Sequence, residues 1–328
     1  MNPIRELQPT RANSTPEPAR GLRSKLSNGV KKFVIIDALA VLHRAWHALP
    51  KLKTEKGQIV NAVYGFSSFL LKILREEKPD CLAVAYDTEK PNFRKEKFKE
   101  YKENRPKQPR EFYDQVKISQ KILEAFSIKY FLADGLEADD LIGALAEKSK
   151  KEGEIIVFTG DKDLLQIVNE KIKVSYLKRS IAETKLYDEK AVIQEYKGLK
   201  PEQLVDFKAL VGDPADNIKG LKGIGPKAAI SLLKKYGSLK NLYEQIETSK
   251  DRTIDEKTLK ILKEGKEKAF FFKDLLSLKS EIEVENFKLE NCLLKFDKEK
   301  VKKVFEEFGF KTLISRLQKI NNLQKSLF

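Results

Sequence analysis

Residues 155–163 read IIVFTGDKD, an apolar run with β-branched residues that leads into a glycine and two aspartates. An unbroken apolar run of this length is typical of a strand buried on both faces of a parallel sheet. Residues 33–37 (FVIID) and 81–87 (CLAVAYD) have the same form, and each also ends at an aspartate. Ligands of open α/β sheets bind at the carboxyl ends of the strands. We therefore expect the three strand ends to bring their carboxylates to one place.

Helical spacing alternates with these strands, and this alternation predicts the fold. An α/β domain with a central, mainly parallel sheet flanked by helices is expected over residues 33–198. The expected elements between the three strands are helices over 39–49, 60–74, 116–126, 138–150 and 162–168 and a short strand over 128–132.

From residue 201 onward the pattern is helical. We expect residues 199–295 to form an α-helical module and residues 296–328 to form a C-terminal helical tail. Residues 1–32 are rich in Pro, Ser and Arg and have no hydrophobic signal-peptide core. They are expected to be a flexible basic extension, with an organellar transit peptide as the alternative.

The charge of the chain points to a polyanionic partner. Its 328 residues include 64 Lys and Arg against 49 Asp and Glu, a formal net charge of +15. A basic surface attracts nucleic acid through its phosphates, although a generally lysine-rich surface gives the same balance. No apolar run approaches the roughly 18 residues of a membrane span, so we expect no membrane partner.

The two cysteines and two histidines exclude several kinds of site. Cys81 and Cys292 are too few and too far apart for a disulfide framework or a zinc knuckle. His43 and His47 stand four residues apart, but no further ligand follows at a zinc-motif spacing. Hard divalent cations with carboxylate and water ligands, Mg²⁺ or Mn²⁺, fit the inventory better.

Nine acidic residues are the candidate metal ligands. Three follow strands, three stand in the EADD segment where a helix begins, and the others belong to the GDKD and GDPADN turns. Acids in a first helical turn are often only caps, but crowded carboxylates at several strand ends need cations to stay ionised. Two such ions activate water and stabilise the leaving oxygen in phosphodiester cleavage. The nine residues are Asp37, Asp87, Glu137, Asp139, Asp140, Asp161, Asp163, Asp213 and Asp216.

Two further segments indicate contacts with nucleic acid. Residues 223–227 (GIGPK) precede a helix, and glycines at a helix N-terminus allow backbone N–H groups to approach a phosphate. Residues 88–115 interleave Lys and Arg with aromatic residues, a mixture suited to a single strand. The alternatives are an ordinary helix start and a solvated loop. Neither segment resembles a helix that reads bases, so we expect structure-directed binding.

The motifs together resemble the 5′ nuclease domain of bacterial DNA polymerase I and its stand-alone relatives in the flap endonuclease superfamily. The matching segments, from about residue 33 to 290, are NAVYGF (61–66), FR (93–94), YKENRP (101–106), EADD (137–140), TGDKDLLQ (159–166), GD (212–213), DNI (216–218) and GIG (223–225). The family's Gly after the first aspartate is Ala38 here, and Lys219 stands where Pro is usual.

The resemblance implies a PIN-like fold, a helical arch over the site, and a helix–three-turn–helix motif in residues 199–295. It implies hydrolysis of DNA from 5′ ends and at 5′ flaps, in replication and repair, with two divalent ions. The tighter metal site would use Asp37, Asp87, Glu137, Asp139, Asp140 and Asp161, and the second ion would lie near Asp163, Asp213 and Asp216. Arg44, Arg94 and Lys102 would act in catalysis, Phe93, Tyr101 and Arg105 would contact the 5′ strand, and Gly223, Gly225 and Lys227 would contact the duplex, with K⁺ at that turn.

Two other functions stay open at this point. One is an RNA-cleaving PIN-type nuclease, which the helix–three-turn–helix signature disfavours. The other is a DNA-binding module with vestigial acids, which the presence of all nine acids disfavours. We expect a monomer in the cytoplasm that works with a separate DNA polymerase, since 328 residues leave no room for a polymerase region.

Overall fold

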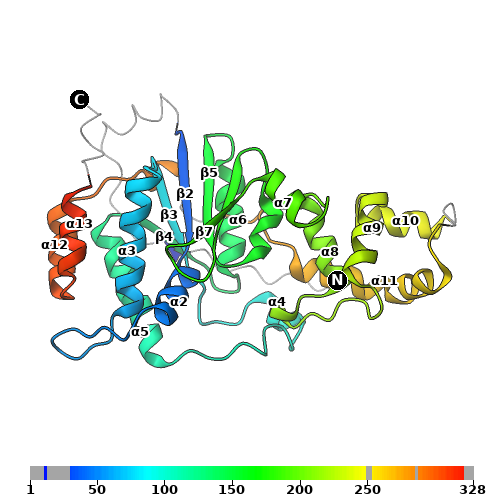
Figure 1. Cartoon of the computed structure of the whole chain (residues 1–328), viewed down its shortest axis with the longest axis horizontal. Helices are drawn as coiled ribbons and strands as arrows, with labels where there is room; N and C mark the ends of the chain where they lie inside the picture. The colour runs from blue at the N-terminus through cyan, green and yellow to red at the C-terminus, as the bar shows by residue number, and fades with distance from the viewer. Residues whose placement is uncertain (1–10, 13–29, 249–252, 285–286, 321–328) are drawn as a thin grey trace.

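The computed structural model describes residues 11–12, 30–248, 253–284 and 287–320. The described chain is elongated (Figure 1): a sheet with flanking helices forms the larger part, and helices α8 to α11 extend from one end of it. Helices α12 and α13 lie at the opposite end. No helix in the described ranges is both long enough and apolar enough to cross a membrane.

The centre of the fold is one sheet with the strand order β1-β4-β3-β2-β5-β6-β7. The five inner strands run parallel, and the two edge strands, β1 and β7, pair antiparallel with their neighbours. Among the described residues the strands are β1 Arg11–Ala12, β2 Lys32–Asp37, β3 Cys81–Ala85, β4 Lys129–Leu132, β5 Glu154–Thr159, β6 Ile172–Leu177 and β7 Thr184–Tyr187. This confirms the expected PIN-like sheet.

The apolar strands are buried on both faces because helices cover each side. Phe33 and Ile35 of β2 belong to the hydrophobic core on one face, and Val34 and Ile36 belong to the core on the other. Helix α6 (Ala138–Ser149) contributes to the first core, which continues into the helices at the end of the molecule. The second core includes α2 (Ala38–Ala48), α3 (Asn61–Glu76), α5 (Arg110–Ala125), α12 (Lys298–Glu307) and α13 (Lys311–Gln318).

A glutamine from α5 caps the start of α3. The residue before α3, Val60, has no side-chain oxygen to accept from the first free N–H groups. Instead Oε1 of Gln115, which is fully buried, accepts from the backbone N of Ala62 and Val63 at 2.7 and 3.1 Å. The cap satisfies two N–H groups that a helix start leaves unpaired, and it fixes α5 against α3.

The helical module begins after α7 (Glu189–Glu195). Buried Asp206 joins three of its helices: it lies in α8, accepts from the backbone N of Leu239 at the start of α10, and pairs with Lys273 of α11 at 2.6 Å. These contacts make the module one packed unit. Its helices are α8 Leu204–Val211, α9 Pro226–Tyr236, α10 Leu239–Glu247 and α11 Glu256–Leu276.

The structure differs from the sequence-based expectations in four places. The helix expected over 162–168 is a 3₁₀-helix, η2 (Lys162–Ile167), and strands β6 and β7 were not foreseen. Most of the basic extension expected over 1–32 lies outside the described residues, but Arg11–Ala12 pair with β4. Between the short α4 (Phe93–Lys97) and α5, the implied arch has no regular helix; residues 98–109 form turns and extended chain.

Candidate metal centre

Two neighbouring strand ends share one hydroxyl group. The register of β2 and β5 pairs Ile36 with Phe158, so Asp37 and Thr159 lie beside each other. Thr159 Oγ1 donates to Asp37 Oδ2 at 2.8 Å and accepts from the backbone N of Asp161 at 3.0 Å. Asp37 also caps α2 by accepting from the backbone N of Ala40. Ala38 is the first helical residue of α2 and is not one of the residues with positive φ, so the turn into α2 does not need the family's Gly at position 38.

The third strand end and the start of α6 complete a first group of acids. Asp87 follows β3, and its Oδ1 accepts from the backbone N of Ala138 at 2.7 Å, which places it at the N-terminus of α6. Asp139 lies in the first turn of that helix, where negative charge is stabilised. We refer to Asp37, Asp87, Asp139 and Asp161 as the strand-end acids.

The strand-end acids have cations nearby but no direct ion pair in the described ranges: the charges of Lys102 and Arg105 oppose the rise in the pKa of Asp87. Within the described ranges, no Lys, Arg or His side chain forms an ion pair with any of the four. Burial, helped by the charges of Asp87 and Asp161, raises the pKa of Asp37 to about 7. Burial also raises the pKa of Asp139 well above its ordinary range, together with Asp161 and Asp37. Buried carboxylates that hold protons because their pKa values are raised can bind a cation in place of those protons.

A second group of acids joins the sheet to the helical module. Asp163 starts η2, whereas Asp213 and Asp216 belong to the loop after α8. One oxygen from each lies within 4.8 Å of the other two. We call these three residues the bridging acids. Gly212 begins the loop with φ +98°, and a Cβ there would lie 2.6 Å from the carbonyl oxygen of Ile218, so only glycine fits.

Cations accompany the bridging acids. Lys208 contacts Asp163 and lies 2.7 Å from Asp213 Oδ2. Burial raises the pKa of Asp213, but the charge and hydrogen bond of Lys208 outweigh it and hold that pKa below its ordinary value. Burial raises the pKa of Asp216 despite the nearby Lys102 and Arg105. Positive charge therefore already lies among the bridging acids.

Glu137 and Asp140 differ from the other predicted ligands because both bind the guanidinium of Arg94. Both oxygens of the fully buried Asp140 are bound by Arg94, at 2.6 and 2.7 Å. Glu137 accepts from Asn92, Arg94, Tyr101 and Lys102. Arg94 is itself 2% exposed and also donates to the backbone oxygen of Leu275. In this structure Arg94 and Asp140 form an internal pair rather than part of an open site.

The chain between α4 and α5 lies against the acids. Lys102 Nζ is 2.7 Å from Glu137, Arg105 is 2.9 Å from Asp216, and the hydroxyl of Tyr101 donates to both carboxylates. Tyr101 is buried, whereas the side chain of Arg105 is 47% exposed. Of the predicted strand-contacting residues in this segment, Lys102 and Arg105 are thus next to the acids, and Tyr101 supports them from inside.

Arg44 and Phe93 lie away from the ion-paired acids. Arg44 lines a cavity of about 180 Å³ with His43, His47 and Arg179, and its guanidinium would be 3.9 Å from a Cβ at Gly160, next to Asp161. Burial lowers the pKa of His43 to about 4, as do the nearby His47, Arg105 and Arg44. Phe93 packs against the core, with the Arg94 guanidinium 4.5 Å from its ring centre.

The predicted duplex-binding turn begins α9. Gly223 has φ +102°, Gly225 is the residue before the helix, and Lys227 is exposed in its first turn. No side chain caps this helix start, so its N–H groups are available to an anion.

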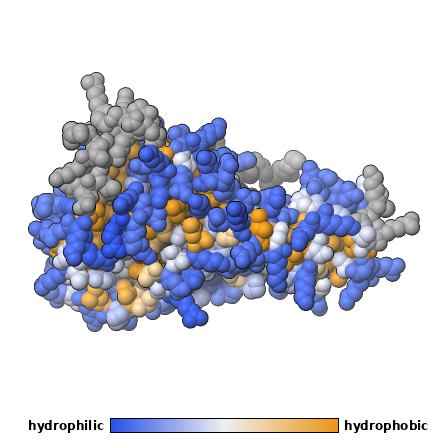
Figure 2. Space-filling view, turned by 45° about the horizontal axis from the view of Figure 1, so that its top comes forward, coloured by the Kyte–Doolittle hydropathy of each residue, from blue (hydrophilic) through white to orange (hydrophobic). Residues whose placement is uncertain are grey.

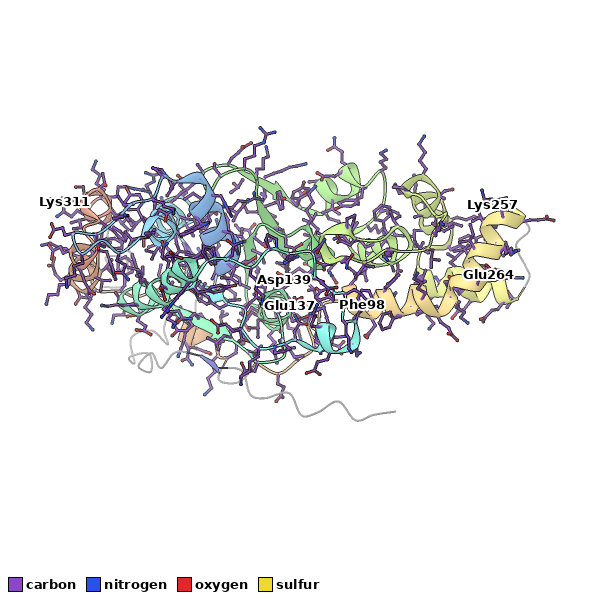
Figure 3. All side chains as sticks on the ribbon, turned by 90° about the horizontal axis from the view of Figure 1, so that it is seen from below. Phe98, Glu137, Asp139, Lys257, Glu264 and Lys311 are labelled. Atoms are coloured by element: carbon purple, nitrogen blue, oxygen red, sulfur yellow. The ribbon has the colours of Figure 1, made fainter. Side chains whose placement is uncertain are left out.

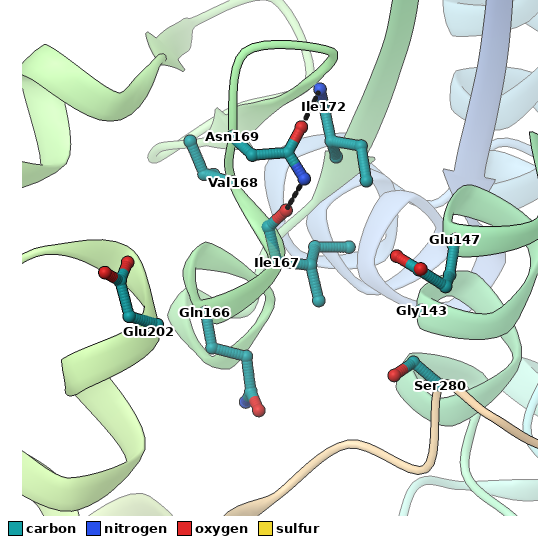
Figure 4. A pocket seen from close by; sticks show the side chains of 9 residues that line it. All are labelled: Gly143, Glu147, Gln166, Ile167, Val168, Asn169, Ile172, Glu202 and Ser280. Carbon is teal, nitrogen blue, oxygen red and sulfur yellow. Dashed lines mark hydrogen bonds between the residues drawn. The ribbon is translucent and has the colours of Figure 1, made fainter. Parts of the chain in front are cut away.

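The acids lie where the sheet meets the helical module. Figure 3 shows Glu137 and Asp139 near the middle of the molecule, between Lys311 at one end and Lys257 and Glu264 at the other. The face in Figure 2 is mostly hydrophilic, with apolar side chains in scattered places. A different cavity of about 290 Å³ lies beside η2 (Figure 4), and none of the predicted site residues lines it.

The family model of the 5′-3′ exonuclease N-terminal resolvase-like domain matches residues 32–197, and that of the 5′-3′ exonuclease C-terminal SAM fold matches residues 199–302. The chain belongs to the 5′-3′ exonuclease family. DNA polymerase I of Bacillus subtilis (strain 168) is 40% identical over 290 residues, 88% of this chain and 32% of that protein. DNA polymerase I of Bacillus caldotenax is 39% identical over 289 residues, again 88% and 32%. The exonuclease chain thus spans about a third of the length of these relatives.

Solved structures share the fold of this 5′-3′ exonuclease family member. A bacteriophage T5 protein crystallised with metal ions aligns with a TM-score of 0.65 and 18% identity, over 88% of this chain and all of that one. The catalytic core of Rad2 in complex with a DNA substrate aligns with a TM-score of 0.59 and 18% identity, over 94% of this chain and 96% of that one. These similarities confirm the PIN-like fold with a helical module.

Proposed function

We propose that this chain is a metal-dependent nuclease that hydrolyses DNA phosphodiesters from 5′ ends and at 5′ flaps, in replication and repair. The observation that carries the proposal is the pair of oxygen-ligand groups, strand-end acids and bridging acids, that meet at the border of sheet and helical module. Membership of the 5′-3′ exonuclease family supports the reaction class.

The donor set suits Mg²⁺ or Mn²⁺. Every candidate ligand atom is a carboxylate oxygen, which hard divalent cations prefer, and none of the strand-end acids forms a direct ion pair with a basic side chain in the described ranges. The strand-end acids would hold one ion and the bridging acids a second. Two bound ions supply an activated water and charge for the leaving oxygen.

The basic residues would position the substrate. Lys102 pairs with Glu137 and Arg105 pairs with Asp216, so a phosphate brought there would exchange these ion pairs for its own oxygens. Arg44 borders the Asp161 strand end from the other side. Gly223, Gly225 and Lys227 would bind the duplex backbone through the start of α9, where K⁺ is part of the proposal. Arg94, Asp140 and Glu137 would fix the position of this machinery from inside.

The proposal extends to partners and location. A single copy carries acids from both domains, which supports a monomer as the working unit. DNA would be the substrate, with a separate DNA polymerase as the functional partner and the cytoplasm as the compartment. The domains would be residues 33–198 for the catalytic sheet, 199–295 for the helical module and 296–328 for the C-terminal helices, preceded by the extension 1–32.

One assay separates this function from its two alternatives. A 5′-flap DNA and the matching RNA are each incubated with Mg²⁺ or EDTA. We expect Mg²⁺-dependent cleavage of the DNA and little of the RNA. Preference for RNA would favour a PIN-type ribonuclease, and tight binding without cleavage would favour a non-catalytic module. Asp161→Ala should abolish turnover and keep DNA binding; near-normal rates would show that the acids are misassigned.

A further inference from the structure

Lys208 connects the helical module to the sheet through the bridging acids. It lies in the middle of α8, and its side chain is 18% exposed. The ammonium contacts Oδ1 of Asp163, which starts η2, and lies 2.7 Å from Oδ2 of Asp213 in the loop after α8. One cation thus joins two carboxylates that come from different domains.

The two acid groups differ in how they are neutralised. The bridging acids share two protein cations: Lys208 binds Asp163 and Asp213, and Arg105 binds Asp216 at 2.9 Å. Over the described ranges, the strand-end acids have no such ion pair. Buried carboxylates without counter-ions are strongly unfavourable, so Lys208 supplies charge that the bridging acids would otherwise lack.

A divalent ion and the Lys208 ammonium need the same carboxylates. An ion held by the bridging acids would take one oxygen from each, and such oxygens lie within 4.8 Å of one another. The ammonium already binds the carboxylates of Asp163 and Asp213. Two cations held by the same carboxylates would stand a few ångströms apart and repel strongly.

We propose that Lys208 is an internal counter-ion that holds the second metal position when no metal is bound, so that its ammonium and the second divalent ion are mutually exclusive. Lys208 is then a positioning residue: it keeps Asp163 and Asp213 together before the ion arrives, and its displacement weakens the binding of that ion. This inference rests on the proposed function, because it takes the bridging acids as the second metal site.

Metal binding by the intact chain tests the inference without an activity assay. Free Mn²⁺ is counted by electron paramagnetic resonance for the wild type, Lys208→Met, Lys208→Arg and a control, Lys240→Met. Lys240 is 74% exposed on α10. We expect the weaker Mn²⁺ class to tighten about tenfold or more in Lys208→Met, since a repelling charge is removed. The affinity of the weaker class should be unchanged in Lys208→Arg and Lys240→Met. The affinity of the tighter class should be the same in the wild type and all three variants.

Thermal unfolding gives an independent readout. In EDTA, Lys208→Met should unfold at a lower temperature than the wild type, and saturating Mn²⁺ should remove the difference. Should Lys208→Met and the neutral Lys208→Gln both fail to fold in EDTA, an NMR titration of the ¹⁵N-lysine-labelled wild type decides. The ammonium signal of Lys208 is assigned as the one that Lys208→Arg lacks. This signal should shift at the Mg²⁺ concentration that fills the weaker site, and an unshifted signal at saturation would overturn the inference.

The outcomes separate this inference from the proposed function. An equal or weaker second Mn²⁺ class in Lys208→Met, with flap cleavage intact in the wild type, would overturn only the role of Lys208. A tightened second class in a protein that cleaves no DNA would support Lys208 and overturn the proposed function. Absence of any Mn²⁺ binding by the wild type would overturn both.

Discussion

Arg94 binds Asp140 through both carboxylate oxygens, and their side chains are 3% and 0% exposed. The backbone oxygens of Leu275 and Ser277 accept from the same guanidinium, and the backbone N of Lys279 donates to Asp140. The pair therefore ties α4 and α6 to the end of α11. Its position explains why one acid of the EADD segment serves the packing of the two domains.

Neighbouring acids of α6 should respond differently to loss of charge. Asp140→Asn leaves the buried Arg94 guanidinium with only its longer ion pair to Glu137, and breaking a buried pair costs up to about 3–5 kcal/mol of stability. Asp139→Asn removes a repelling charge beside Asp161 and Asp37, so it should maintain or raise stability in EDTA while weakening Mn²⁺ binding. Urea unfolding and Mn²⁺ titration check both variants. Equal loss of stability in the two would contradict the assignment.

The stability of the metal-free protein should fall as pH rises. The pKa of Asp37 is about 7 in the folded chain against an ordinary value of 3.8, so the folded state binds the extra proton between about pH 4 and 7. At about 1.4 kcal/mol per tenfold change in proton affinity, Asp37 alone accounts for up to about 4 kcal/mol. This contribution is present below pH 4 and is lost by pH 7.

Bound metal should reverse the fall in stability with rising pH, because it replaces protons on the same carboxylates. Melting temperatures measured from pH 5 to 8 should diverge, with the Mg²⁺ sample gaining over the EDTA sample as pH rises. Asp37→Asn is the matched control, and its EDTA curve should be flatter over the same range. A gain from Mg²⁺ that is largest at pH 5 would contradict this account.

Removal of Lys227 should weaken duplex binding without changing the reaction. It is exposed in the first turn of α9 and has no role at the acids. In Lys227→Ala, affinity for nicked duplex DNA should fall equally for different sequences. The slope of log affinity against log salt should shrink by about 0.9, the value of one phosphate contact. Fluorescence anisotropy in Ca²⁺ measures this, with Lys240→Ala as the control that should keep the wild-type slope.

Replacement of Gln115 should lower the folding stability of the protein. Gln115→Ala leaves two buried N–H groups of α3 without an acceptor, which costs about 1–3 kcal/mol for each unsatisfied group. Chemical unfolding should show this loss, whereas Lys117→Ala, an exposed position on the same helix, should be nearly neutral. A loss below 0.5 kcal/mol, the scale of ordinary surface changes, would contradict the capping role.

The sequence predicted most of the sheet, because buried parallel strands leave an unmistakable apolar run. The expected strands at 33–36, 81–86 and 155–159 correspond to β2, β3 and β5. Strands β6 and β7 were missed because their residues, such as Lys173 and Lys185, mix charged and apolar side chains. The pairing of Arg11–Ala12 with β4 is a long-range contact, and a two-residue strand is too short to leave a recognisable sequence pattern.

For the candidate site, the sequence predicted which acidic residues are present but not which side chains each of them contacts. The EADD motif contains three acids, yet only the turn of the helix decides that Asp139 faces the strand ends while Asp140 faces Arg94. Lys208 carries no motif of its own; a lysine one turn before the Gly212-Asp213 loop is the signal that could have indicated it. The roles of the nine acids and the DNA contacts stay predictions.

The bridging acids have a consequence for how this protein can be rebuilt. Asp163 lies in the region matched by one family model and Asp213 and Asp216 in the region matched by the other, and the two models meet at residue 198. Neither half contains all three bridging acids. A chimaera that exchanges one half with a distant relative would have to inherit the interface as well, so the two halves are expected to evolve together rather than as interchangeable modules.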